Sequence, residues 1–117
     1  MKHRVYLDHL SGGALAPEVS AAMRPWLEEI PGNTASLHQH GLKARDALDT
    51  AAAQCAAKIG AAADDLVFTS SGTEANNLAV KGVAEAQRER GTHLILSNIE
   101  HPSIDQSVAW LEQQGFT

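Results

Sequence analysis

The sequence predicts an α/β protein, because two short apolar segments enclose a segment with helical periodicity. Residues 66–69 (Leu-Val-Phe-Thr) and 94–97 (Leu-Ile-Leu-Ser) have the length and the aliphatic and β-branched content of buried strands. Between them, residues 73–90 repeat apolar positions at the spacing of a helix, and Gly91 follows. A strand, a helix and a strand within about thirty residues form a βαβ unit, which predicts parallel strands joined by a right-handed crossover.

Two helices are expected before this unit. Pro17 suits the first turn of a helix, and Pro25, inside the same apolar pattern, predicts a kink or two short pieces. A long alanine-rich helix is expected from Gly41 to Ile59, and Gly60 suits the left-handed conformation that ends a helix.

One helix is expected after the unit, from Pro102 to Gln114, with Gly115 as its stop. In each of these three helices, apolar residues at helical spacing mark a face that should be buried. The residues expected on these faces are Val19, Met23, Trp26, Leu27 and Ile30 in the first helix, Leu48, Ala52, Cys55 and Ile59 in the second, and Ile104, Val108 and Leu111 in the last.

Composition and charge exclude several classes of protein. The chain has 117 residues, enough for one domain, and its net charge of −5 without a basic stripe argues against a nucleic-acid partner. No segment approaches the roughly 20 apolar residues of a membrane span, and the amino terminus lacks a signal-peptide pattern. A single cysteine, Cys55, excludes a disulfide framework and a cysteine-based metal site. We therefore expect a soluble, cytoplasmic protein in which Cys55 fills apolar space.

A phosphate-binding turn is indicated where the first strand meets its helix. Ser71 and Glu74 stand three apart, the spacing of a capping box in which each side chain accepts a bond from a free backbone N–H. Gly72 lets a ligand approach the backbone, and the helix start offers unpaired N–H groups and the positive end of the dipole. The alternative is a capped helix without a ligand. Asn76 and Asn77, like Glu74, are expected to cap and pack.

A histidine is expected at the same edge of the sheet as this turn. Ligands of parallel sheets bind beyond the carboxyl ends of the strands. Residues 71–73 follow the first strand, and residues 98–102, which include His101, follow the second. A histidine beside a turn is more often structural than catalytic, so both roles of His101 stay open on this evidence. His38 and His40 form an H-x-H pair, but no neighbouring residue supplies a third ligand, and no metal is predicted.

Further short motifs stand before and after this turn along the sequence. They are Tyr6–His9, Pro17–Val19, Gly32–Asn33, Ser36–His38, Gly41, Ala44–Arg45, Phe68–Ala79 and Glu100–Pro102. In order and spacing these motifs resemble the amino-terminal part of class V, pyridoxal-phosphate-dependent cysteine desulfurases. The resemblance runs from Tyr6 to the chain end and implies that residues 1–117 are an incomplete portion of the large domain of fold type I transferases, stopping mid-domain. In that fold later strands lie between the two predicted ones, which would leave both with exposed edges.

The resemblance also implies a cofactor and a reaction. Gly72 and Thr73 would bind the phosphate of pyridoxal 5′-phosphate, and His101 would stack on the pyridine ring and shuttle protons as a catalytic residue. The family reaction removes sulfur from L-cysteine, leaving L-alanine and an enzyme persulfide, in the service of iron–sulfur cluster assembly. In the relatives a homodimer partner completes the cofactor site.

Two departures from the family pattern qualify this expectation. His9–Gly13 stands where desulfurases usually have an Asn-Ala-Thr-Thr run on the substrate side. That segment leaves open a class V aminotransferase or a lyase of selenocysteine or kynurenine type. The Schiff-base lysine and the persulfide cysteine of the family have no counterpart here, because none of Lys2, Lys43, Lys58 and Lys81 matches.

The chain alone is therefore expected to be inactive and to need the remainder of the enzyme or a second subunit. A third hypothesis is non-catalytic: a stand-alone module that binds partners through its unpaired strands. It predicts a stable, monodisperse fold without affinity for pyridoxal phosphate.

Overall fold

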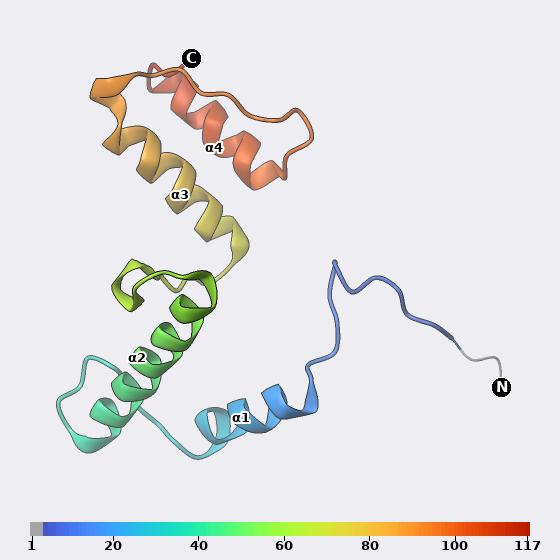
Figure 1. Ribbon diagram of the computed structural model, residues 1–117, viewed down its shortest axis with the longest axis vertical. Coiled ribbons are helices and arrows are strands. Elements are labelled where there is room, and N and C mark those ends of the chain that lie inside the picture. The colour runs from blue at the N-terminus through green and yellow to red at the C-terminus, as the bar shows by residue number, and fades with distance from the viewer. Residues whose placement is uncertain (1–3) are drawn as a thin grey trace. The chain divides into compact units, whose positions relative to one another are not determined.

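The computed structural model describes residues 4–117, which form helices and connecting segments without a strand (Figure 1). They divide into two compact units, Met1–Leu66 and Val67–Thr117. The elements are α1 (Pro17–Glu28), α2 (Gln39–Ile59) and the short 3₁₀ helix η1 (Ala63–Asp65) in the first unit, and α3 (Gly72–Ala86), the 3₁₀ helix η2 (Arg88–Arg90) and α4 (Pro102–Gln113) in the second. Among these described residues, no helix combines the length and apolar character needed to cross a bilayer.

The first unit has the two predicted helices. Pro17 occupies the first turn of α1, as predicted, whereas Pro25 lies inside one continuous helix and does not divide it into two pieces. The α2 helix starts two residues earlier than expected, with His38 as its N-cap. It ends at Gly60, whose φ of +69° is the left-handed conformation that favours glycine.

The apolar faces predicted for α1 and α2 are largely exposed, with only Ile30 and Ala52 half-buried, so these predictions of burial were wrong. Met23 and Trp26 are each 42% exposed and Ile59 is 73% exposed, while α1 has no buried residue. Cys55, expected as an apolar filler, is also exposed. An apolar helical face is buried only when a second apolar layer covers it, and the described part of the first unit contains no such layer.

The second unit is built on two helices that lie side by side, α3 and α4 (Figure 1). Both helices run in the same direction, because the start of α3 contacts the start of α4 and the same holds at their ends. Between them lies a small core whose members are Ala84, Leu111 and Phe116, with the partly buried Val80 and Leu94 packed against it. The inner face predicted for α4 is confirmed at Leu111, which is fully buried.

The end of α4 explains how Phe116 reaches this core. Gly115 has a φ of +90°, and its N–H donates to the carbonyl of Glu112 at 3.0 Å. The N–H of Phe116 donates to the carbonyl of Leu111 at 3.1 Å. This pair of bonds is the Schellman motif, in which the residue after the glycine folds back onto the helix. The predicted stop at Gly115 is therefore confirmed, and it places Phe116 against Leu111.

The two predicted strands are absent from residues 4–117, so the βαβ unit predicted over residues 66–97 is not confirmed. Val67 and Ile95 are 65% and 89% exposed, and the two segments do not pair with each other. A strand needs a hydrogen-bonded neighbour, and local sequence cannot supply one. One parallel pairing does begin after α4: Thr117 N–H donates to Thr92 O at 2.9 Å, and Leu94 N–H donates to Thr117 O at 2.7 Å.

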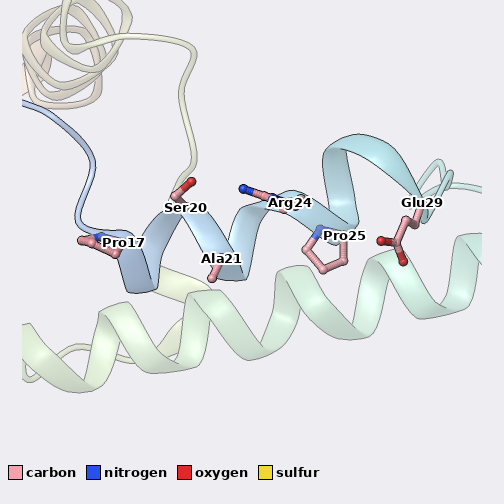
Figure 2. A pocket seen from close by; sticks show the side chains of 6 residues that line it. All are labelled: Pro17, Ser20, Ala21, Arg24, Pro25 and Glu29. Carbon is pink, nitrogen blue, oxygen red and sulfur yellow. The ribbon is translucent and has the colours of Figure 1, made fainter.

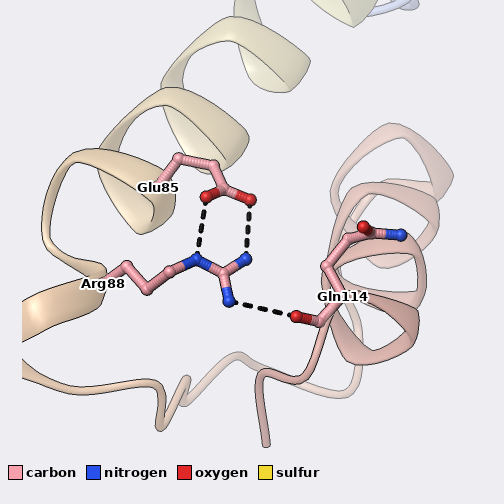
Figure 3. Close-up of polar contacts among 3 residues, drawn as sticks. All are labelled: Glu85, Arg88 and Gln114. Atoms are coloured by element: carbon pink, nitrogen blue, oxygen red, sulfur yellow. Dashed lines mark hydrogen bonds and ion pairs between the residues drawn. The ribbon is translucent and has the colours of Figure 1, made fainter.

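Arg88 joins the carboxyl ends of α3 and α4 (Figure 3). Its guanidinium makes a bidentate pair with Glu85, at 3.0 and 2.9 Å, and donates to the carbonyl of Gln114 at 3.1 Å. The same group lies 4.4 Å from the ring centroid of Phe116, within cation–π distance. The pair lowers the pKa of Glu85, because the carboxylate accepts bonds from Arg88, and raises the pKa of Arg88. Arg88 therefore covers the open end of the core.

Candidate functional site

The amino-terminal ends of α3 and α4 border an open hollow of about 320 Å³ within the second unit. Six residues line it: Ser71, Gly72, Thr73, Asn76, His101 and Ser103. All three residues predicted for the cofactor site are among them. The structure thus brings Gly72 and Thr73 together with His101, although a helix and an extended connection separate them in sequence.

The start of α3 is capped by the side chains of Ser71 and Glu74. The Ser71 hydroxyl accepts from the N–H of Glu74 at 3.3 Å, as the predicted capping box requires. The Glu74 carboxylate, however, accepts from the N–H and the hydroxyl of Ser70, each at 2.6 Å, rather than from the N–H of Ser71. These bonds lower the pKa of Glu74 from its ordinary value of 4.5, the side-chain bond most. The capping box is confirmed with one partner shifted by a residue.

The first turn of α3 presents free hydrogen-bond donors to the hollow. The first N–H groups of a helix have no carbonyl partner inside it. Within residues 4–117, no acceptor contacts the N–H groups of Gly72 and Thr73. A Cβ placed on Gly72 would meet no atom within 4 Å beyond the adjoining residues and the backbone of its own helix, so the chain's own packing does not require glycine there. Two free donors, a positive helix end and an open approach are the features that hold a phosphate.

His101 is the N-cap of α4 and takes part in a hydrogen-bond network that sequence analysis missed. Its Nδ1 accepts from the N–H of Ser103 at 3.1 Å and lies 2.8 Å from the Ser103 hydroxyl oxygen. The Asn76 side chain on α3 donates to the same hydroxyl at 2.8 Å. Asn77, predicted to cap and pack, lies inside α3, where its side chain donates to the Thr73 carbonyl at 2.9 Å and caps no free N–H. Asn76 reaches across to α4. The one available signal was a serine directly after His101-Pro102.

Two other groups singled out by the sequence lie in the first unit. His38 caps α2, because its Nδ1 accepts from the N–H of Gly41 at 3.3 Å, and the rings of His38 and His40 meet edge to face. The segment His9–Gly13 follows Asp8, whose carboxylate accepts from the hydroxyl of Ser11 at 2.8 Å.

A further hollow lies along α1 (Figure 2). It is lined by Pro17, Ser20, Ala21, Arg24, Pro25 and Glu29. All six come from one helix and the residue that ends it, and none of them is a predicted site residue. Arg24 and Glu29 carry its only charges, of opposite sign. The hollow at the starts of α3 and α4 is therefore the candidate site.

Comparison with known proteins identifies the family of the chain. Residues 5–117 match the model of the aminotransferase class-V family. The chain is 44% identical over 116 residues to the cysteine desulfurase IscS of Dictyoglomus turgidum (strain DSM 6724 / Z-1310). The matched region covers 99% of this chain and 29% of the relative.

Two solved structures are similar to the chain as well. One is a NifS-like protein, with a TM-score of 0.89 and 30% sequence identity over 98% of this chain and 32% of that one. The other is SspA in complex with cysteine, with a TM-score of 0.84 and 35% identity over 95% of this chain and 32% of that one. The chain thus spans about 30% of the length of the proteins that it matches.

Proposed function

We propose, on the premise that this chain belongs to the aminotransferase class-V family, that it forms the phosphate-binding part of the cofactor site of a cysteine desulfurase. Pyridoxal 5′-phosphate is the cofactor of this family. The observation that carries the proposal is the single hollow lined by Gly72, Thr73 and His101. Gly72 and Thr73 are distant in sequence from His101, and the three residues come together only in the folded chain. Gly72 and Thr73 have donors for the phosphate, and His101 has an aromatic ring for the pyridine.

Each residue has a separate role in this proposal. The N–H groups of Gly72 and Thr73 bind the phosphate at the start of α3, and the Thr73 hydroxyl is a further donor. His101 packs on the pyridine ring and moves a proton, a task for which imidazole suits neutral pH. When bound, the cofactor supplies an electron sink for carbanion chemistry on an amino acid. The protein's part is to orient the cofactor and to place the imidazole.

The proposed reaction of the whole enzyme is the removal of sulfur from L-cysteine, which leaves L-alanine and an enzyme persulfide. The IscS relative named above and the SspA structure with cysteine support this substrate. In the proposal residues 1–117 are the amino-terminal part of a fold type I large domain, within a homodimer that serves iron–sulfur cluster assembly. No lysine is among the six residues that line the hollow, so in the proposal the remainder of the enzyme supplies the Schiff-base lysine and the chain alone does not turn over.

The substrate distinguishes this function from its nearest alternatives. The segment His9–Gly13 departs from the desulfurase pattern and would suit an aminotransferase or a lyase of another amino acid. A protein that carries this chain together with the remainder of the enzyme should form alanine and persulfide in equal amounts from cysteine. Transfer of the amino group to a keto acid, without persulfide, would overturn the proposed reaction.

The binding role can be tested on the chain itself. Millimolar pyridoxal phosphate should shift the amide NMR signals of Gly72, Thr73 and His101, because free donors bind the phosphate. Pyridoxal, which lacks the phosphate, is the matched control and should leave the signals of Gly72 and Thr73 unchanged. Borohydride treatment should give only weak, scattered labelling of lysines. Equal shifts with both compounds, or one stoichiometric adduct at a single lysine, would contradict the proposal.

A further inference from the structure

We propose that Ser103, supported by Asn76, is a positioning residue that holds His101 in the tautomer with its proton on Nε2. This proposal deepens the proposed function. It rests on that function only for the role of His101 toward the cofactor. The tautomer itself follows from hydrogen bonds within the second unit, between groups on α3 and α4.

The backbone N–H of Ser103 determines which nitrogen of the ring is an acceptor. This N–H can only donate, and it lies 3.1 Å from Nδ1 of His101. Nδ1 must therefore present its lone pair. A neutral imidazole carries one N–H, so its proton is on Nε2.

The hydroxyl of Ser103 adds a second donor to the same nitrogen. The Asn76 amide nitrogen donates to this hydroxyl oxygen at 2.8 Å, which leaves the single hydroxyl proton for Nδ1 of His101, also 2.8 Å away. Ser103 is only 7% exposed, so water does not replace these partners freely. A chain of bonds thus runs from α3 through the Ser103 hydroxyl to the ring of His101.

This network has a consequence for the site. Among residues 4–117 no acceptor contacts Nε2 of His101, so in this tautomer the ring offers a free N–H donor. Such a donor suits an oxygen atom of a bound substrate or cofactor, and does not suit another N–H. Because His101 is also the N-cap of α4, the network fixes the ring relative to the helix as well as its proton.

The test measures the tautomer directly, by long-range ¹H–¹⁵N NMR of the His101 ring in the 117-residue chain without cofactor. A His101→Phe variant identifies the signals of this ring among those of the other histidines. We expect the wild-type ring to carry its proton on Nε2. In Ser103→Ala the ratio of the two tautomers should fall about fivefold, which is the effect of one typical net hydrogen bond.

Matched variants separate positioning from packing. Ser107→Ala removes a hydroxyl from the same helix at a residue that is 1% exposed and bonds only to the Ser103 carbonyl, and it should leave the tautomer unchanged. Ser103→Thr retains the hydroxyl and should retain the wild-type ratio. Asn76→Asp should act like Ser103→Ala, because a carboxylate draws the Ser103 proton away from His101.

Two results would overturn the proposal: a wild-type ring that averages between tautomers as free imidazole does, or a ratio that Ser103→Ala leaves unchanged. The cofactor experiment on the same chain tests the proposed function separately. If pyridoxal phosphate leaves His101 unaffected while the tautomer depends on Ser103, only the proposed function fails. If pyridoxal phosphate binds and Ser103→Ala leaves the tautomer ratio of His101 unchanged, only the positioning role fails.

Discussion

Gly72 lines the hollow, and a substitution there can affect ligand binding without disturbing the packing of the chain. A Cβ at this position has free space around it, and the helix that starts there would tolerate alanine. Glycine is therefore not required by the fold as it stands. Because Gly72 lines the hollow, a methyl group there would instead reduce the space open to a ligand.

Gly72→Ala should therefore weaken the binding of pyridoxal phosphate and leave folding intact. We expect a loss on the order of tenfold, the effect of one hydrogen bond to a charged group. Amide shifts in a titration measure the binding, and thermal unfolding checks the fold. Gly82→Ala is the matched control, because Gly82 lies on the same helix with equally free space and does not line the hollow. It should bind normally and gain about 0.5–1 kcal/mol of stability. Equal binding by the two variants would exclude the proposed role of Gly72.

At the scale of the element, Leu111 is the most deeply buried apolar side chain with which α4 packs against α3. Leu111 is fully buried between them, and it contacts the other members of the only core cluster among the described residues. Its neighbours on the inner side of α4 include the serines 103 and 107, whose hydroxyls are bonded and contribute little apolar area. Leu111 is therefore the one fully buried apolar side chain of α4, while Ile104 and Val108 on the same face are half-buried.

Leu111→Ala should cost about 2–5 kcal/mol of the free energy of unfolding, the range for truncating a buried leucine. Urea unfolding followed by the fluorescence of Trp110 on α4 measures the change. Leu78→Ala is the control on α3: Leu78 is 53% exposed, and its truncation should cost much less. Equal losses in the two variants would mean that the helices are not held together as described.

The sequence predicts some features of these elements and not others. Helix ends were predicted well where one residue decides them: Pro17 at the start of α1, Gly60 after α2 and Gly115 after α4. Three of the six residues of the hollow, Gly72, Thr73 and His101, were predicted for the cofactor site, because local spacing predicts the capped turn and the family resemblance adds the histidine. The strands predicted at 66–69 and 94–97 and the burial predicted for the faces of α1 and α2 are not found among residues 4–117, because each needs a distant segment as its partner.

The two bonds made by Ser103 were missed for a related reason. A serine in the first turn of a helix usually serves that turn alone, and nothing in the sequence shows that Asn76, 27 positions earlier, contacts it. Only the parallel packing of α3 and α4 brings the two side chains together.

At the scale of the whole molecule, large apolar side chains are exposed over both units. Leu10 and Leu37 are fully or almost fully exposed in the first, and Ile99 is 88% exposed in the second. Single exposed apolar residues are ordinary, but so many in a chain of this size exceed what a stable monomer usually shows. In the proposed function these surfaces are covered by the remainder of the enzyme.

The 117-residue chain on its own should therefore associate with itself and bind a hydrophobic dye such as ANS, with a several-fold rise in fluorescence. Size-exclusion chromatography at increasing concentration and dye titration measure the two effects. A variant that combines Leu10→Ser, Leu37→Ser and Ile99→Ser is the control. These residues lie outside the helices, so helix content should stay the same while association and dye binding fall. A monodisperse wild-type chain that binds neither dye nor pyridoxal phosphate would instead favour the stand-alone interaction module, because that hypothesis requires a complete surface and no cofactor.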